Sequence, residues 1–394
     1  MNKIGFLLPH LEDGGIPKIA SNISLNIDDK YEQYVITLIK NFDINYEFDA
    51  ELVEIEGIGK NFISKLVVFF RRVRKVRKVK KELNLDVVIS FGVAANIVNI
   101  LSKNNEKIIC TEHNIKSIEN KSWGFFGIIY DFLIKIFYKR SNEIIAISKM
   151  MKRDLKNHYS LENNIKVIYN PHDINDIINK SNEKIEKKYE DLLEKDYIVA
   201  IGKTQIRKGF WHLIKVLKKL HEEFPHLHLI ILGPKGEIHD QIVKLVTKLN
   251  IEDKVHFLGF QDNPYKFIAK ANLFVMTSLN EGLPNVIIES LALETPVIST
   301  DCISGPREIL QKDPELDKSI SNYQKVDYGI LIPELKRKPD FEDCDLEETE
   351  EILFEAIKEL LKDKELYNRY KNKSLGRARD FDVSKVIKKY EALL

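Results

Sequence analysis

Short apolar runs rich in β-branched residues alternate with longer amphipathic segments along almost the whole chain, and this alternation restricts the fold more than any other feature. In the first half we expect strands at residues 3–8, 34–39, 87–90, 107–111, 143–147 and 166–169. The pattern starts again in the second half, at residues 197–201, 227–232, 255–258, 273–276, 297–299 and 329–332. Strands that alternate with helices are typical of parallel sheets covered by helices. The sequence therefore predicts an α/β protein.

The length of the chain indicates two domains, because 394 residues exceed one compact domain of usual size. Residues 173–196, between the two sets of strands, are rich in Lys, Glu and Asn, which is typical of a charged linker or a surface helix. We therefore expect one domain at residues 1–172 and a second at 173–380, followed by a final helix within 381–394. Ligands of parallel sheets bind at the carboxyl ends of the strands, which predicts a site in a cleft between the domains.

The distribution of charges and cysteines argues against several classes of protein. The chain carries 61 Lys and Arg against 60 Asp and Glu, but residues 1–170 hold 26 of the basic and 20 of the acidic residues, so the first half is basic. Three cysteines without close spacing argue against a disulfide framework or a zinc knuckle. The first apolar run is too short for a signal peptide, and none reaches the roughly 20 residues of a membrane span. We expect a cytoplasmic protein, soluble or peripheral on the inner face of the plasma membrane.

The most informative motif for chemistry holds two carboxylates, Glu281 and Glu289, eight positions apart after the predicted strand at 273–276. Between them a Gly-Leu-Pro-Asn turn contains Pro284, whose fixed φ and missing N–H suit the first position of a helix. Backbone amides at a helix N-terminus bind anions, so the turn predicts a phosphate site flanked by two acceptors of hydroxyl groups. The alternative is an ordinary strand–loop–helix junction with two exposed glutamates.

This arrangement resembles the E-x7-E motif of retaining glycosyltransferases of family 4. That resemblance implies the GT-B fold, in which two Rossmann-like domains with parallel sheets face each other across a cleft. It also implies that Glu281 orients the donor sugar and that Glu289 binds the ribose of the nucleotide. The donor site would further include the residues of the turn, which are Gly282, Leu283, Pro284 and Asn285.

A basic loop after the strand at 197–201 is similar to the G-R-x-x-x-x-K-G element of the same family, with Lys203 in place of the arginine. The resemblance implies that Lys208 and Lys203 stabilise the departing diphosphate. Lys203 lacks the two-pronged guanidinium, so Lys208 is the stronger candidate and Arg207 is a reserve. The alternative is a solvent-exposed loop with ordinary lysines. Downstream, Leu258 lies in a segment that resembles the part of the family beside the nucleobase.

In the first half, Gly14 and Gly15 follow the first predicted strand, where paired glycines allow a ligand to approach the backbone. They match the glycine-rich first loop of GT-B enzymes, which faces the donor. The chain has no G-x-G-x-x-G pattern, which weakens a nicotinamide interpretation. His113, after the strand at 107–111, resembles the acceptor-side histidine of the family. The alternative is a histidine with an ordinary structural role.

The resemblance as a whole implies a retaining hexosyltransferase with Glu281, His113 and Lys208 as catalytic residues. The donor would be a nucleotide-diphosphate sugar, with UDP the commonest choice in the family, and neither a metal nor another cofactor would be needed. The acceptor would be a glycan or a lipid-linked glycan in cell-surface polysaccharide synthesis. The final helix at 381–394 would pack back on the first domain. Two alternatives are a non-catalytic partner subunit with the GT-B fold and a sugar-nucleotide epimerase.

One basic stretch indicates where a membrane could bind. Residues 60–81 contain ten Lys and Arg and no acidic residue, interleaved with apolar residues at helical spacing. Residues 123–138 are rich in aromatic side chains and end in a Lys-Arg pair. Basic and apolar residues on one helix are typical of helices on anionic membranes. A solvated helix face and a core helix are alternatives. Neither a helix-turn-helix nor a stacking platform accompanies the stretch, so we do not expect nucleic acid as a partner.

Overall fold

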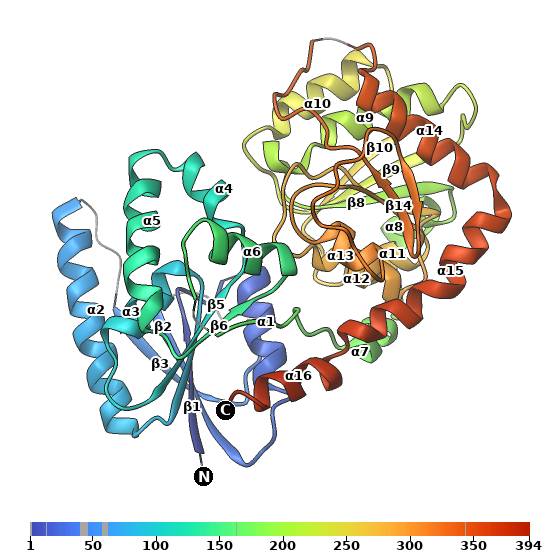
Figure 1. Cartoon of the computed structure of the whole chain (residues 1–394). Helices are drawn as coiled ribbons and strands as arrows, with labels where there is room; N and C mark the ends of the chain where they lie inside the picture. The colour runs from blue at the N-terminus through green and yellow to red at the C-terminus, as the bar shows by residue number, and fades with distance from the viewer. Residues whose placement is uncertain (1, 13, 40–45, 57–61, 163, 343) are drawn as a thin grey trace. The chain divides into compact units, whose positions relative to one another are not determined.

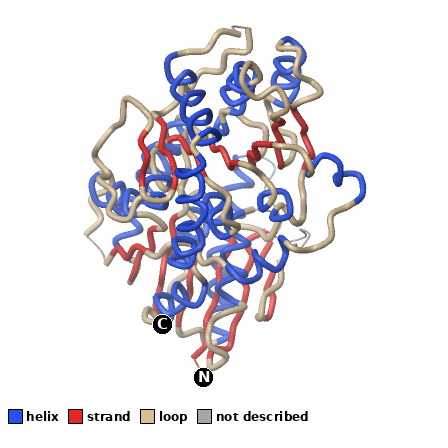
Figure 2. The backbone as a smooth tube through the Cα atoms, turned by 90° about the vertical axis from the view of Figure 1, so that its right-hand side faces the viewer, coloured by secondary structure: helices blue, strands red, loops and turns tan. Residues whose placement is uncertain are grey.

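The computed structural model describes residues 2–12, 14–39, 46–56, 62–162, 164–342 and 344–394. The chain forms two compact units, shown in Figure 1. Unit 1 comprises Met1–His172 and Asp382–Leu394, and unit 2 comprises Asp173–Phe381. Each unit contains a seven-stranded sheet with helices on its faces. The tube in Figure 2 shows the strands in red beside the blue helices that cover them.

The sheet of unit 1 is parallel throughout and has the order β3-β2-β1-β4-β5-β6-β7. Its strands are β1 (Asn2–Leu8), β2 (Tyr31–Ile39), β3 (Glu51–Glu56), β4 (Val87–Phe91), β5 (Lys107–Glu112), β6 (Glu143–Ala146) and β7 (Ile165–Val167). The helices are α1 (Gly15–Ser24), α2 (Phe62–Leu83), α3 (Val93–Leu101), α4 (Lys116–Ser122), α5 (Phe125–Phe137), α6 (Lys149–Asn157) and α16 (Val383–Glu391).

Alternation along the strands of unit 1 builds a separate apolar core on each face of the sheet. Ile4 and Phe6 of β1 pack in one core with α1 and with Ile387 of the C-terminal helix α16. Leu7, the next residue after Phe6, packs on the opposite face with Val76 of α2. Successive strand residues point to opposite faces, so a strand buried on both sides is apolar at consecutive positions. Such consecutive apolar positions are the pattern that predicts the strands.

The sheet of unit 2 has the order β10-β9-β8-β11-β12-β14-β13 and is parallel except for the antiparallel pair of β13 and β14. Its strands are β8 (Tyr197–Ile201), β9 (His228–Leu232), β10 (Val255–Gly259), β11 (Leu273–Met276), β12 (Val297–Thr300), β13 (Gln324–Val326) and β14 (Gly329–Ile332). The helices are α7 (Ile174–Ser181), α8 (Lys187–Leu193), α9 (Phe210–Leu220), α10 (His239–Lys248), α11 (Tyr265–Ala269), α12 (Asn285–Ala292), α13 (Pro306–Leu310), α14 (Glu348–Lys362) and α15 (Lys364–Ala378).

The prediction of two Rossmann-like α/β sheets is confirmed, and the expected strands form with small shifts at their ends. Two edge strands, β3 and β13, were missed. In β3 three of six residues are glutamates, and Ile55 is the one buried residue among 51–55, whose burial is described, so the strand lacks an apolar run. Of the two interpretations of the segment 173–196, the structure confirms the helical one, because the segment forms α7 and α8, and α7 packs against α11 and α12.

The chain enters unit 2 and leaves it at neighbouring positions. The backbone N–H of Val383 donates to the carbonyl of His172 at 2.8 Å, so the two connecting segments are paired within unit 1. Each connection is followed by a helix with an aspartate cap. The side chain of Asp173 accepts from the amide of Asp176 at the start of α7, and Asp382 caps α16 in the same way.

Candidate active site

The predicted site residues of unit 2 gather where the strand order of its sheet reverses direction. Strand β8 lies between β9, which follows it in the chain, and β11, which comes later. The connections after β8 and β11 therefore leave the same edge of the sheet toward opposite sides, which opens a crevice between them. Residues 202–209 follow β8 and residues 277–284 follow β11. The basic loop and the E-x7-E turn thus come together through topology, although 73 positions separate Lys208 from Glu281.

An ion pair joins these two loops. The Nζ of Lys208 lies 2.7 Å from Oε1 of Glu281, and Nη1 of Arg207 lies 3.6 Å from the other carboxylate oxygen. Burial raises the pKa of the Glu281 carboxyl, but the charges of Lys208 and Arg207 outweigh that effect, so the pKa is lowered overall. Glu281 is therefore ionised at neutral pH. Its carboxylate can accept hydrogen bonds from hydroxyl groups.

Backbone contacts fix the geometry of the two loops. The hydroxyl of Thr277 donates to the carbonyl of Lys208 at 2.9 Å, and the amide of Leu279 donates to the carbonyl of Arg207 at 2.9 Å. Gly209 has a φ of +61°, and a Cβ atom there would lie 2.3 Å from the carbonyl oxygen of Thr277. Only glycine allows this close approach without strain. The basic loop is therefore held directly against the strand end that leads to Glu281.

The turn after Glu281 departs from the prediction by one residue. Helix α12 begins at Asn285, and Pro284 is the residue before it, with φ −74° and ψ 92°. An extended ψ at Pro284 places this residue at the N-cap, so Asn285 and not Pro284 is the first helical residue. Gly282, Leu283 and Pro284 are buried, and Asn285 is half-buried. The amide of Ile287 donates to the carbonyl of Pro284 at 3.0 Å, and the positive end of the helix dipole lies at this turn.

Two residues outside the predicted set of site residues support this turn from the loop after β12. The hydroxyl of Ser304 donates to the carbonyl of Gly282 at 2.6 Å. Gly305 has a φ of +97°, and a Cβ atom there would lie 2.3 Å from Cδ of Pro284. The small residues at 304–305, directly after a buried strand, were the available signal. Spacing along the sequence could not reveal which turn they contact.

The second carboxylate of the motif lies deeper in unit 2. Glu289 is on α12 and 4% exposed, and the hydroxyl of Tyr265 lies 3.4 Å from its Oε1. Tyr265 begins α11 and was not among the predicted site residues. Leu258 is half-buried in β10, and its backbone carbonyl accepts from Nε2 of the Gln261 side chain at 2.7 Å. Lys203 is exposed at the start of the basic loop.

The predicted residues of unit 1 follow β1 and β5. Gly14 and Gly15 are exposed at the start of α1, and a Cβ atom at Gly14 would come no nearer than 3.7 Å to another atom. The fold itself therefore does not require glycine at position 14. His113 follows β5 and is 7% exposed, and its ring stacks on Phe91 with 5.8 Å between ring centroids. Burial lowers the pKa of His113 to about 3, so its ring is neutral at pH 7.

Comparison with known proteins identifies the family. Residues 14–176 match the family model described as Glycosyltransferase Family 4, and residues 181–315 match the model described as Glycosyl transferases group 1. An uncharacterized glycosyltransferase of Methanocaldococcus jannaschii is 35% identical over 93% of this chain and 93% of its own length. The chain belongs to glycosyltransferase family 4. The glycosyltransferase is also 28% identical, over 98% of its length and 97% of the relative's, to N-acetylgalactosamine-N,N'-diacetylbacillosaminyl-diphospho-undecaprenol 4-alpha-N-acetylgalactosaminyltransferase of Campylobacter jejuni.

Solved structures confirm the GT-B fold. Sucrose-phosphate synthase from Thermosynechococcus elongatus matches this glycosyltransferase with a TM-score of 0.76 at 15% identity, covering 100% of this chain and 98% of the other. HepE of Anabaena in complex with UDP matches with a TM-score of 0.74 at 19% identity, covering 99% of each chain. At these identities the structures establish the fold.

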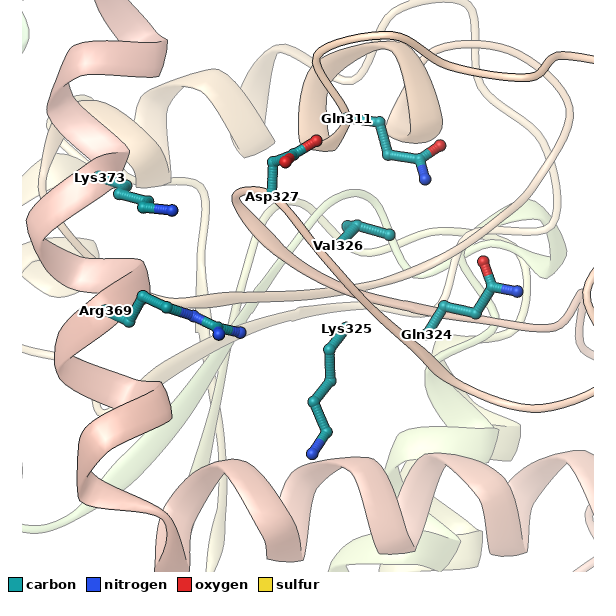
Figure 3. A pocket seen from close by; sticks show the side chains of 7 residues that line it. All are labelled: Gln311, Gln324, Lys325, Val326, Asp327, Arg369 and Lys373. Carbon is teal, nitrogen blue, oxygen red and sulfur yellow. The ribbon is translucent and has the colours of Figure 1, made fainter.

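Outside the predicted site, the structure describes a further polar pocket in unit 2. Figure 3 shows a pocket lined by Val326 and by six polar or charged side chains of β13, α15 and their surroundings, and none of the predicted site residues lines it. No group of three or more His, Cys, Asp or Glu within the described ranges is arranged to hold a metal ion. The tripeptide 343–345 has the form D-x-D, but residue 343 lies outside the described residues. None of the described helices has the length and apolar character needed to cross a membrane.

Proposed function

We propose that this glycosyltransferase transfers a hexose from a UDP-sugar to a lipid-linked glycan during assembly of a cell-surface polysaccharide. The transfer retains the anomeric configuration and needs neither a metal ion nor another cofactor. The observation that carries the proposal is the ion pair of Lys208 and Glu281 beside the start of α12. A cation and the N-terminus of a helix suit a departing diphosphate, and a carboxylate suits the hydroxyls of a sugar.

Each group has a defined part in the proposed reaction. The bond between the anomeric carbon and the β-phosphate oxygen breaks while the acceptor oxygen forms its bond on the same face. The proton of the acceptor hydroxyl passes to the departing phosphate oxygen. Lys208, Lys203 and the first amides of α12 neutralise the phosphate charge. Glu281 orients the sugar.

The remaining site residues bind the rest of the donor in this proposal. Glu289 accepts hydrogen bonds from the ribose hydroxyls, and Leu258 lies beside the base. Gly14 and Gly15 leave room for the donor at the start of α1, where both are exposed. His113 lies beside the reacting sugar as a neutral ring. HepE, which has the same fold, was solved with UDP and with UDP-glucose, and this supports UDP as the nucleotide.

Thermal stabilisation by a panel of UDP-, GDP-, ADP- and CMP-sugars in the presence of EDTA tests the donor. We expect a melting shift with UDP-sugars alone, because a ligand that binds only the folded state stabilises it. Glu289→Ala should abolish the shift, whereas Glu252→Ala, at an exposed glutamate of the same unit, should keep it. A melting shift with the sugar of another nucleotide, and none with UDP-sugars, would identify that nucleotide as the donor's in place of UDP. No shift with any donor would favour the non-catalytic partner subunit. NMR of the product's anomeric proton then tests retention.

The acceptor proposal rests on the surface of unit 1. The C. jejuni relative is named for an acceptor on diphospho-undecaprenol, a lipid that resides in a membrane. On α2, Leu66, Val67 and Phe70 are each about half exposed among exposed basic residues of the predicted stretch 60–81. Lys60 itself lies outside the described residues. This combination favours an anionic membrane, because apolar side chains insert while the lysines and arginines attract lipid phosphates.

A second exposed apolar surface of unit 1 supports the same partner. On α5, Phe125 is 73% exposed, Ile128 67% and Phe132 62%. Helix α3 packs against both α2 and α5, so the two exposed helices flank it on one face of the sheet, as Figure 1 shows. Large exposed apolar patches on a soluble protein mark interaction sites.

Sedimentation with vesicles tests membrane binding. We expect the protein to bind vesicles that contain phosphatidylglycerol and not vesicles of phosphatidylcholine alone. Charge reversal at three exposed basic residues of α2, namely Lys65, Arg71 and Arg74, should abolish binding. The matched control reverses three exposed lysines of α15, namely Lys364, Lys371 and Lys373, and should bind like the wild type. Equal binding by both triple variants would exclude α2 as the contact.

A further inference from the structure

A buried ion pair closes the loop that follows β12. Asp301 is the first residue after β12, and Arg307 is the second residue of α13. The Nε of Arg307 donates to Oδ1 of Asp301 at 3.0 Å, and its Nη2 donates to the other oxygen of the same carboxylate. The side chain of Arg307 is 8% exposed and that of Asp301 is 10% exposed. Two parallel hydrogen bonds fix a guanidinium and a carboxylate in one relative orientation, so the pair holds the two ends of the loop together.

Both partners of this ion pair are anchored elsewhere in unit 2. The amide of Asp301 donates to the carbonyl of Ile332, on β14, at 2.8 Å. The Nη1 of Arg307 donates to the carbonyl of Glu315 at 3.1 Å. Each of the three guanidinium nitrogens therefore has an acceptor within unit 2. This set of contacts favours a role of Arg307 in holding the loop over a role in binding a ligand.

The tip of the same loop is strained where it meets the turn at residues 282–285. Ser304 has a φ of +74°, a left-handed conformation in which the Cβ of an L-residue crowds the backbone. A non-glycine residue keeps such a conformation only when the surrounding contacts hold it there. The hydroxyl of Ser304 donates to the carbonyl of Gly282, and a Cβ atom at Gly305 would lie 3.1 Å from Cα of Leu283. The strain is thus located at the contact between the closed loop and the turn.

We propose that Asp301 and Arg307 are positioning residues, whose ion pair holds the turn at residues 282–285 in place through Ser304 and Gly305. The proposal rests on the function proposed above, in which this turn connects Glu281 to the N-terminus of α12. Negative charge on the diphosphate grows as its bond to the sugar breaks. A displaced turn therefore raises the energy of the transition state more than it weakens binding of the donor. The ion pair should control kcat more strongly than KM.

Asp301→Asn, Arg307→Gln and the double variant form a cycle that tests this role. Both residues act through one pair, so the double variant should lose no more activity than the weaker of the two single variants. Arg307→Lys keeps the positive charge and loses the two-pronged contact, so it should retain part of the activity that Arg307→Gln loses.

Glu106→Gln is the matched control, because it makes the same change from carboxylate to amide in another buried ion pair. Oε1 of Glu106 lies 2.8 Å from Nζ of Lys80, and the two side chains are 2% and 0% exposed. Glu106 directly precedes β5, at the end of that strand opposite to His113. We expect this variant to melt at a lower temperature and to keep the kcat and the KM of the wild type.

The first measurement is kcat per binding site, with the sites counted by calorimetric titration with UDP. Counting sites removes the effect of unfolded protein, so a loss of stability alone does not change this value. We expect Asp301→Asn to lower kcat per site at least about tenfold, as for other misplaced charge-stabilising groups. The KM for the donor should change much less, which is the pattern of an interaction that acts in the transition state.

The second measurement is hydrogen exchange, which reports on the turn without turnover. Amides at 282–290 should exchange faster in Asp301→Asn than in the wild type, because the loop that holds the turn is released. Amides of β9 (His228–Leu232), in the same unit, should exchange at the same rate in both proteins. Equal exchange at 282–290 in a folded variant would overturn the proposal.

The outcomes separate this inference from the proposed function. An unchanged kcat per site in Asp301→Asn, or losses that add up in the double variant, would refute the role of the ion pair. If the wild type transfers no sugar from any donor, the proposed function fails, and the exchange rates still decide whether the pair holds the turn. If Asp301→Asn does not fold, Arg307→Lys replaces it with the same two measurements.

Discussion

The side chain of Lys208 contacts Glu281 through its ammonium group at 2.7 Å, while its methylene groups occupy the space above Gly202. A Cβ atom at Gly202 would lie 2.6 Å from Cε of Lys208 and 2.9 Å from its Cδ. Glycine at 202 therefore leaves room for the methylene groups of Lys208, and Glu281 holds its ammonium group. This arrangement connects the end of β8 with the end of β11 across the point where the strand order reverses.

Gly202→Ala should displace Lys208 and lower activity. The added methyl group forces the lysine stem to move, and Gly202 also has a φ of +151°, which alanine rarely adopts. We expect kcat to fall at least about tenfold, as for other misplaced charge-stabilising groups. The matched control is Gly376→Ala in α15, where a Cβ atom meets nothing within 4 Å. That variant should keep full activity and gain about 0.5–1 kcal/mol of stability. Equal activity of the two variants would contradict the role of Gly202.

Lys208→Met should destabilise unit 2 as well as reduce activity. The substitution leaves the buried carboxylate of Glu281 with only Arg207 at 3.6 Å. Removing one partner of a buried pair costs about 3–5 kcal/mol, and the remaining arginine reduces this to about 1–3 kcal/mol. The control is Lys219→Met, which breaks a pair with Glu351 of similar length but with both side chains at least one third exposed. That loss should stay below about 1 kcal/mol in urea titrations.

Features that depend on local pattern were predictable from the sequence. Consecutive apolar residues made β4 predictable, and the E-x7-E spacing made Glu281 and Glu289 candidates for the site. The sequence was insufficient where a residue's role depends on a distant partner. Nothing near Gly305 in sequence indicates that it packs on Pro284. The acidic strand β3 is held by its pairing with β2 and by the packing of Ile55 in the core beside α2, and both partners are distant in sequence. Pro284 itself was placed one residue too far into the helix, because proline suits both positions sterically and ψ decides between them.

Tyr265→Phe should weaken donor binding only slightly. The hydroxyl of Tyr265 lies 3.4 Å from Oε1 of Glu289, which is long for a hydrogen bond, and the tyrosine ring remains in place after the substitution. A hydrogen bond of this kind contributes at most about 1 kcal/mol, so we expect the Kd for the donor to rise less than about fivefold. Isothermal titration with the UDP-sugar found in the panel checks this. A loss as large as that of Glu289→Ala would mean that Tyr265 contacts the donor directly.

The stability of the protein should fall as the pH decreases from 7 to 5, and His113 should account for part of the loss. Burial lowers its pKa to about 3 in the folded state, against about 6.5 in the unfolded chain. Between these two values the unfolded chain binds the additional proton, so the free energy of unfolding decreases as the pH falls. The contribution is complete above pH 6.5. At pH 5 the difference of about 1.5 pH units corresponds to a loss of about 2 kcal/mol.

His113→Phe isolates this contribution, because phenylalanine fills the space of the ring and does not titrate. We expect urea titrations at pH 7 and pH 5 to show a smaller difference in unfolding free energy for the variant than for the wild type, even if the variant is less stable at both. His226→Phe, at an exposed histidine of unit 2, corrects for the general effect of removing a histidine. If the wild type and His113→Phe lose the same free energy, His113 is protonated in the folded state at pH 5.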